Sequence, residues 1–188
     1  MLKVSKVIVT TLVGFCGLPA AACPTIEDLG KGIEFRTADG DVEVHRQLRP
    51  DWVTISVSFS DGDGSFLETY LGIYLLSVIP IEAGFPKPGD REDYASSEEL
   101  AQWQRPVPDQ SWRNTTPGGG QAVSGPMETT MIAGCRYNSF EVVLQFADDD
   151  TYKETYDYLP DLGVGLLTKT EASDGTDTYS YISVRALD

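Results

Sequence analysis

The feature that most constrains the fold is a two-residue alternation of apolar and polar side chains in segments separated by short turns. From Trp52 to Phe59 every second residue is apolar, and Thr or Ser stands between them. Phe140–Phe146 repeats the alternation, again with apolar residues at every second position. A period of two is that of a β-strand with one buried face. The chain is therefore predicted to build its core from sheets.

Further strands are predicted from shorter runs and from one long apolar run. Phe66–Ile79 is apolar enough to be buried on both faces, and Gly72 marks a bulge or a close approach of backbone. Asp-Gly pairs such as Asp61-Gly62 supply the positive-φ glycine of tight hairpins. The shorter strands are expected at Ile33–Arg36, Val42–Gln47, Thr151–Tyr158, Val164–Thr170 and Thr176–Val184. Hairpins in series predict an all-β fold, an antiparallel meander forming a sandwich or half-barrel.

One long segment, residues 84–126, does not fit the meander. It is rich in Pro and Gly and has little apolar periodicity, so it is predicted to be an irregular excursion between two halves of the domain. A short helix is expected to begin at Ser97 and reach Trp103. Trp103 and Trp112 are expected to fix the excursion onto the sheet, with partner binding as the alternative.

Residues 1–22 have the pattern of a secretory signal peptide. Lys3 and Lys6 precede an apolar run that ends in small residues at Ala22. The run is too short to cross a bilayer core of about 30 Å. Cleavage after Ala22 would leave residues 23–188 as a single β-rich domain with no membrane span.

The mature chain would keep two cysteines, Cys23 and Cys135. An even pair in an oxidising compartment favours a disulfide. The alternative is lipidation of Cys23 as the new N-terminus, although Ala20 stands where that motif prefers a large aliphatic residue. The predicted location is periplasmic or secreted, or membrane-anchored if Cys23 is lipidated.

Charge argues against a nucleic-acid partner. The chain has 14 Lys and Arg against 29 Asp and Glu, and removal of Lys3 and Lys6 leaves a mature net charge of −17. Phosphate backbones and anionic membrane surfaces would repel such a chain. The expected partner is an unidentified ligand or envelope protein.

Two similar hairpins place carboxylates among aromatic residues. Glu68-Thr69-Tyr70 follows one acidic turn, and Glu154-Thr155-Tyr156 follows another. Paired acids are the minimum for glycoside hydrolysis, so Glu68 and Glu154 are candidate catalytic residues. The favoured interpretation is that both acids lie on solvated faces. Tyr70, Tyr156, Trp103 and Trp112 are candidate binding residues.

Asp61, Asp63 and Glu68 place oxygen ligands at spacings like those of a calcium loop, with Asp148–Asp150 as a weaker second cluster. A hairpin turn explains the same residues, so no metal or other cofactor is predicted. His45 alternates with Val42 and Val44, which predicts a solvated imidazole.

Short motifs at the two ends of the mature chain carry a resemblance. Cys23–Leu29 with Gly32-Ile33, and Tyr158–Val164, resemble a group of uncharacterised exported proteins of Gram-negative α-proteobacteria. The resemblance implies an envelope location and no particular chemistry. The predicted function is a non-enzymatic envelope protein that binds a ligand or protein partner; the alternative is a hydrolase acting on an extracellular polymer.

Overall fold

The structure is a computed structural model of the chain and describes residues 22–95, 100, 103–113, 120–146 and 151–188. The predicted leader up to residue 21, most of the helix expected from Ser97, and the Asp148–Asp150 cluster lie outside these residues. Within them the chain forms two antiparallel sheets and two short 3-10 turns, η1 (Ile26–Gly30) and η2 (Pro88–Asp90). The predicted all-β antiparallel fold is confirmed.

The first sheet contains eight strands and is a meander in chain order, except that the last strand of the protein joins its first edge. The order is β15-β1-β2-β3-β4-β5-β6, and β7 also pairs with β5. Its strands are β1 (Ile33–Thr37), β2 (Val42–Arg49), β3 (Trp52–Ser58), β4 (Gly64–Tyr70), β5 (Tyr74–Glu82), β6 (Phe85–Pro86), β7 (Glu92–Asp93) and β15 (Tyr181–Ala186).

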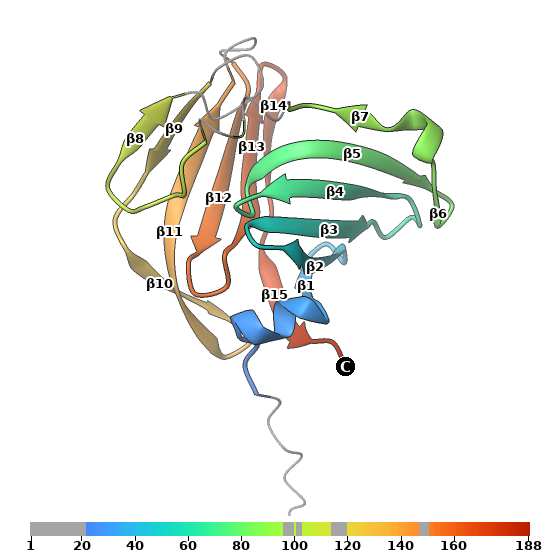
Figure 1. Cartoon of the computed structure of the whole chain (residues 1–188), viewed down its shortest axis with the longest axis horizontal. Helices are drawn as coiled ribbons and strands as arrows, with labels where there is room; N and C mark the ends of the chain where they lie inside the picture. The colour runs from blue at the N-terminus through green and yellow to red at the C-terminus, as the bar shows by residue number, and fades with distance from the viewer. Residues whose placement is uncertain (1–21, 96–99, 101–102, 114–119, 147–150) are drawn as a thin grey trace, which may run out of the picture.

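The second sheet contains seven strands in the order β14-β13-β12-β11-β9-β8, with β10 paired to β11. Its strands are β8 (Ser111–Arg113), β9 (Gln121–Ser124), β10 (Glu128–Ile132), β11 (Cys135–Gln145), β12 (Lys153–Leu159), β13 (Val164–Ala172) and β14 (Gly175–Thr178). Strands β3–β5 run crosswise to β11–β13, so the two sheets meet as a sandwich whose layers are rotated against each other (Figure 1).

The inward faces of the sheets form two hydrophobic clusters. The first cluster joins β1 and β3 to β13 through Ile33, Phe35, Val53 and Val164. The second cluster is built around the β4–β5 corner and β11. Trp103 and Trp112 belong to the second cluster at 6% and 7% exposure. Their burial agrees with the expectation that they fix the excursion onto the sheets.

Three predicted segments need correction. Phe66–Ile79 is not one strand but the β4–β5 hairpin, which turns at Leu71–Ile73. Residues 84–126 are not wholly irregular, because β6 to β9 form short strands there. Thr176–Val184 divides between β14 and β15, which belong to different sheets. The chain crosses between the sheets at residues 179–180, where Tyr179 N donates to Thr168 O and Ser180 O accepts from Ala38 N.

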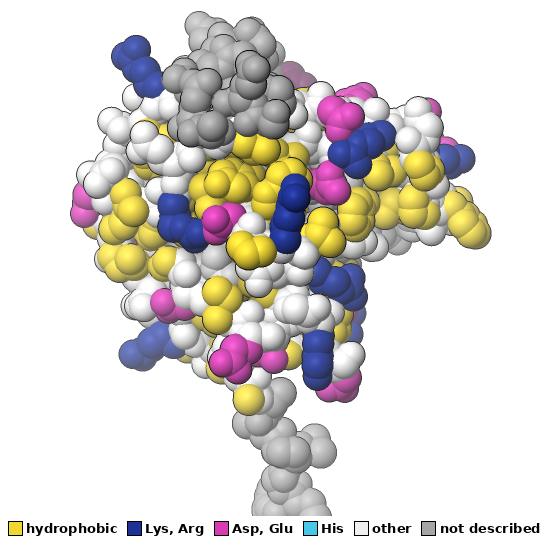
Figure 2. Space-filling model, in the orientation of Figure 1, with side chains coloured by type: hydrophobic (Ala, Val, Ile, Leu, Met, Phe, Trp, Pro, Cys, Tyr) yellow, Lys and Arg dark blue, Asp and Glu magenta, His cyan; other side chains and the backbone are white. Residues whose placement is uncertain are grey.

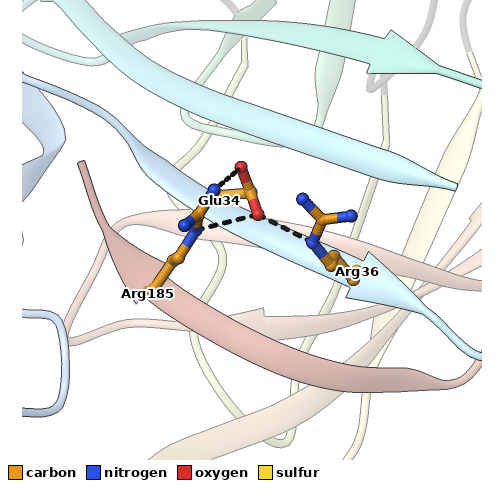
Figure 3. A network of polar contacts seen from close by, with 3 residues as sticks. All are labelled: Glu34, Arg36 and Arg185. Carbon is orange, nitrogen blue, oxygen red and sulfur yellow. Dashed lines mark hydrogen bonds and ion pairs between the residues drawn. The ribbon is translucent and has the colours of Figure 1, made fainter. Parts of the chain in front are cut away.

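An ion-pair network fixes the returning strand β15 to β1. Glu34 lies opposite Arg185 in the antiparallel ladder. The Arg185 guanidinium donates to both carboxylate oxygens of Glu34, at 2.9 and 2.7 Å, and Arg36 Nε donates to one of them at 2.8 Å (Figure 3). The hydrogen bonds from Arg185 have the largest effect and lower the pKa of Glu34; burial acts in the opposite direction, and the hydrogen bond from Arg36 lowers the pKa further.

The predicted disulfide is present. Cys23 and Cys135 are bonded, with their Cα atoms 5.5 Å apart. The bond joins the segment before η1 to the start of β11. Lipidation of Cys23 would need the same sulfur atom, which this bond occupies.

The surface shown in Figure 2 carries both signs of charge. Lys and Arg side chains are scattered among Asp and Glu on this face rather than gathered into a stripe. A phosphate backbone is best bound by a continuous basic surface, and this face does not offer one.

Candidate functional site

A cavity of about 310 Å³ lies between the two sheets. One wall is the inner face of β2–β5, and the opposite wall comes from β12 and β13, with Tyr179 from the crossing segment. A cavity of this size is at the lower end of the range for small-molecule pockets, about 300–1,000 Å³. It is the candidate binding site.

The walls are mostly apolar because alternate residues of each strand point inward. On β4, Ser65, Leu67 and Thr69 line the cavity, whereas Phe66 and Glu68 point to the other face. The remaining apolar lining residues from neighbouring strands include Ile55, Val57, Leu75 and Leu167. Such a surface favours the burial of an apolar ligand, at about 25 cal/mol per Å² removed from water.

Glu154 is a carboxylate set into this apolar wall. Tyr156 Oη donates to its Oε2 at 2.7 Å, and Tyr152 Oη donates to its Oε1 at 3.0 Å. Burial raises the pKa of Glu154, while the hydrogen bonds from Tyr156 and Tyr152 act in the opposite direction. Each carboxylate oxygen has a second lone pair, so Glu154 can accept further hydrogen bonds from a ligand.

Glu43 contributes a second inward-facing carboxylate. His45 Nε2 lies 2.9 Å from one oxygen of Glu43, and Tyr181 Oη donates to the other at 2.9 Å. The His45 side chain is fully buried, and its ring meets Phe35 edge to face with centroids 5.0 Å apart. Among the described residues, His45 Nδ1 has no hydrogen-bond partner. Nε2 is therefore the nitrogen of His45 that can donate to Glu43, whereas an N–H at Nδ1 would be buried without a partner.

The burial of His45 corrects the prediction that it is solvated. Its neighbours in the ladders are Ile33 on β1 and Ile55 on β3, both of which face the core. Residues directly opposite each other in a sheet share a face, so this register turns His45 inward. Glu43, opposite Phe35 and Val57, follows it. The apolar Val42 and Val44 suggested that their own face of β2 points into the core, because that face is also half-buried.

The structure does not bring Glu68 and Glu154 together. Glu154 lines the cavity, whereas Glu68 is on the outer face of β4, where Ser77 Oγ donates to it at 2.9 Å. Arg91, in the segment returning along β5, forms an ion pair with Glu68 at 2.8 Å. A glycosidase pair must flank one bond, with carboxyls about 5–10 Å apart. Carboxylates on the opposite faces of a sheet layer do not meet that requirement.

The acidic turn residues have local partners. Asp61 Oδ1 accepts from the Asp63 backbone N at 3.1 Å, and Asp63 Oδ1 accepts from the Ala83 backbone N at 2.9 Å. These bonds shape the β3–β4 turn and link it to the end of β5. Among the described residues, no group of three or more His, Cys, Asp or Glu side chains is arranged to hold a metal ion.

Of the four candidate aromatic binding residues, Tyr156 lines the cavity. Tyr70 packs edge to face with Trp52, at 6.4 Å between ring centroids. Trp112 Nε1 donates to Tyr74 Oη at 2.8 Å, and Tyr74 stacks against Trp103 at 5.1 Å between centroids. These last two contacts belong to the second hydrophobic cluster and not to the cavity.

Comparison with known proteins adds one distant structural neighbour. No protein-family model matches the chain, and no curated protein matches it. The crystal structure of the hypothetical lipoprotein YmcC from Escherichia coli (K12) is similar over 85% of this chain and 88% of that one, with 13% identity and a TM-score of 0.39. Over the described residues, no helix has the length and apolar character that crossing a membrane would require.

Proposed function

We propose that this chain is an exported protein of the bacterial envelope that binds a small, largely apolar ligand between its two sheets. The observation that carries the proposal is the cavity of about 310 Å³ with mostly apolar walls and a few acidic lining residues, among them Glu154. Ligand pockets commonly combine such walls with a few polar groups that orient the ligand.

Export is supported by the disulfide and by the leader-like sequence. The Cys23–Cys135 bond is of a kind that persists in oxidising compartments and is rare in the cytosol. The apolar run before Ala22 is the segment that would direct the chain there.

Binding is tested with Nile red, a neutral apolar dye, and its displacement by decanol. The mature, disulfide-bonded protein is expected to enhance the dye's fluorescence saturably, and decanol is expected to reverse the enhancement. Leu67→Trp should weaken binding at least tenfold, because Leu67 lines the cavity and the larger ring would fill it. Phe66→Trp is the matched control, since Phe66 lies on the opposite face of the same strand.

The proposal fails if neither the dye nor decanol binds saturably. It fails equally if Leu67→Trp and Phe66→Trp change binding to the same extent. Thermal melts of both variants establish that each is folded under the binding conditions.

A further inference from the structure

The charges that line the cavity are all of one sign. The charged residues that line it are Asp41, Glu43 and Glu154. Among the described residues that line the cavity, none is Lys, Arg or His. An anionic ligand head would therefore find no counter-charge there and would be placed beside carboxylates in a poorly solvated space.

We propose that the ligand of this cavity is an amphiphile with a cationic, hydrogen-bonding head, such as a primary alkylammonium, whose head binds Glu154 and whose chain lies against the apolar walls. The inference rests on the proposed function, because it specifies the class of ligand for the same cavity. It excludes a fatty-acid carboxylate as the preferred occupant.

Glu154 is the carboxylate best placed to receive the head. Each oxygen of Glu43 and of Glu154 has one partner, but the partners of Glu43, His45 and Tyr181, do not line the cavity, whereas Tyr156, a partner of Glu154, does. Glu154 is fixed from the protein side by Tyr152 and Tyr156, and each of its oxygens keeps acceptor capacity. An ammonium group has three donors, so it can satisfy Glu154 while restoring the neutrality that burial favours.

Tyr156 and Tyr179 complete the environment of the head. Both line the cavity, on β12 and in the segment that crosses between the sheets. Aromatic faces attract cations and tolerate alkyl chains, so these rings suit the junction between head and tail. A hydroxyl head could also donate to Glu154, but it would lack the charge that makes such hydrogen bonds stronger.

The test compares three ligands with the same decyl chain and different heads: decylamine, decanol and decanoate. Calorimetric titrations of the mature disulfide-bonded protein are run at pH 7 in about 0.15 M salt, where screening limits binding to the acidic surface. Decylamine is expected to bind about tenfold or more tightly than decanol, because its head forms a charge-assisted hydrogen bond. Decanoate is expected to bind most weakly.

Glu154→Gln is expected to reduce decylamine affinity to the level of decanol while leaving decanol affinity within about twofold, since the amide keeps the size of the side chain and one acceptor oxygen, and its NH2 group can donate to the second tyrosine oxygen. Glu171→Gln is the matched control. Glu171 is a surface residue of β13 paired with Lys169, and its removal changes the net charge equally. Decylamine binding should be unchanged in this variant.

The outcomes separate the two proposals. If all three ligands fail to bind, the proposed function itself is wrong. If decanol binds but decanoate equals or exceeds decylamine, or if Glu154→Gln leaves the preference for decylamine intact in a protein with an unchanged melting temperature, the cationic-head inference is overturned and apolar binding stands. Equal losses in Glu154→Gln and Glu171→Gln would assign the preference to overall charge and also overturn it.

Discussion

At the scale of single residues, Gly72 sets how closely the two sheets approach. Its φ is +77°, and a Cβ at this position would lie 2.4 Å from the carbonyl oxygen of Gly163, in the turn that joins β12 and β13 of the second sheet. Gly165 N donates to Gly72 O at 3.1 Å, so backbone meets backbone at this corner. The turn also forms one edge of the cavity.

Gly72→Ala is expected to lower the free energy of unfolding by about 2–4 kcal/mol, because it adds a steric clash to the strain of a left-handed alanine. Gly84→Ala is the matched control: its φ is +80°, and a Cβ there would meet nothing within 4 Å. That variant should lose about 1 kcal/mol from strain alone. Urea unfolding of both measures the difference, and equal losses would contradict the clash.

The close approach at Gly72 was predictable from the sequence, whereas the inward orientation of His45 and Glu43 was not. A glycine inside a long apolar run is visible without knowledge of its partner, and the predicted close approach is what the structure shows. The side of a strand that faces inward depends on its register with its neighbours. Val42 and Val44 gave the opposite answer for β2, and the facing Phe35 and Ile55 could have indicated the correct one once pairing was known.

At the scale of elements, strand β15 depends on Glu34 for its attachment to β1. The Glu34 side chain is 8% exposed, whereas Arg185 and Arg36 are 56% and 46% exposed. The carboxylate is thus shielded from solvent, whereas both guanidinium groups are exposed, and this exposure limits the strength of each ion pair. Because Arg185 belongs to β15 and Glu34 to β1, this network helps to hold β15 against β1.

Glu34→Gln is expected to destabilise the protein by about 1–2 kcal/mol at pH 7 through loss of charge-assisted hydrogen bonds. Arg185 and Arg36 lower the pKa of Glu34, so the stabilisation is present above the ordinary pKa of about 4.5 and is lost as the pH falls through the lowered value. The difference in the free energy of unfolding between wild type and variant should therefore become smaller below about pH 4.5. Urea unfolding at pH 7, 5, 4 and 3 checks this, with Glu171→Gln as a surface control.

Most individual strands were predictable, but the division of Thr176–Val184 between two sheets was not. Alternation and β-branched residues mark a strand wherever it pairs. The crossing at residues 179–180 is fixed by the backbone bonds of Tyr179 to one sheet and Ser180 to the other. Those partners, Thr168 and Ala38, are distant in sequence, so no local pattern indicates them.

At the scale of the whole molecule, the hairpin series predicted an antiparallel meander forming a sandwich or half-barrel, whereas the cavity depends on how one sheet packs on the other. Glu154 and Tyr156 come from the second sheet and face residues of β2–β5 in the first. The predicted solvated face of Glu154 is wrong because β12 packs over the first sheet there. How one sheet packs on the other depends on contacts between distant segments, and the periodicity of a single strand does not indicate them.

The Cys23–Cys135 disulfide acts on the whole chain, because it joins residues separated by 112 positions and links the start of the first half to the second sheet. In the chain-entropy model, closing such a loop stabilises the folded state by about 4–5 kcal/mol. Reduction, or replacement of both cysteines by serine, is therefore expected to lower the free energy of unfolding by that amount. It should also steepen the dependence of the free energy of unfolding on denaturant, since the unfolded chain becomes more extended.

Within the described chain, neither cysteine lines the cavity, so the reduced protein should still bind decanol at low denaturant. Urea titrations with and without dithiothreitol measure the loss, and the double serine variant, which should not respond to the reductant, is the control. A loss below about 1 kcal/mol would show that the unfolded chain is already constrained without the bond.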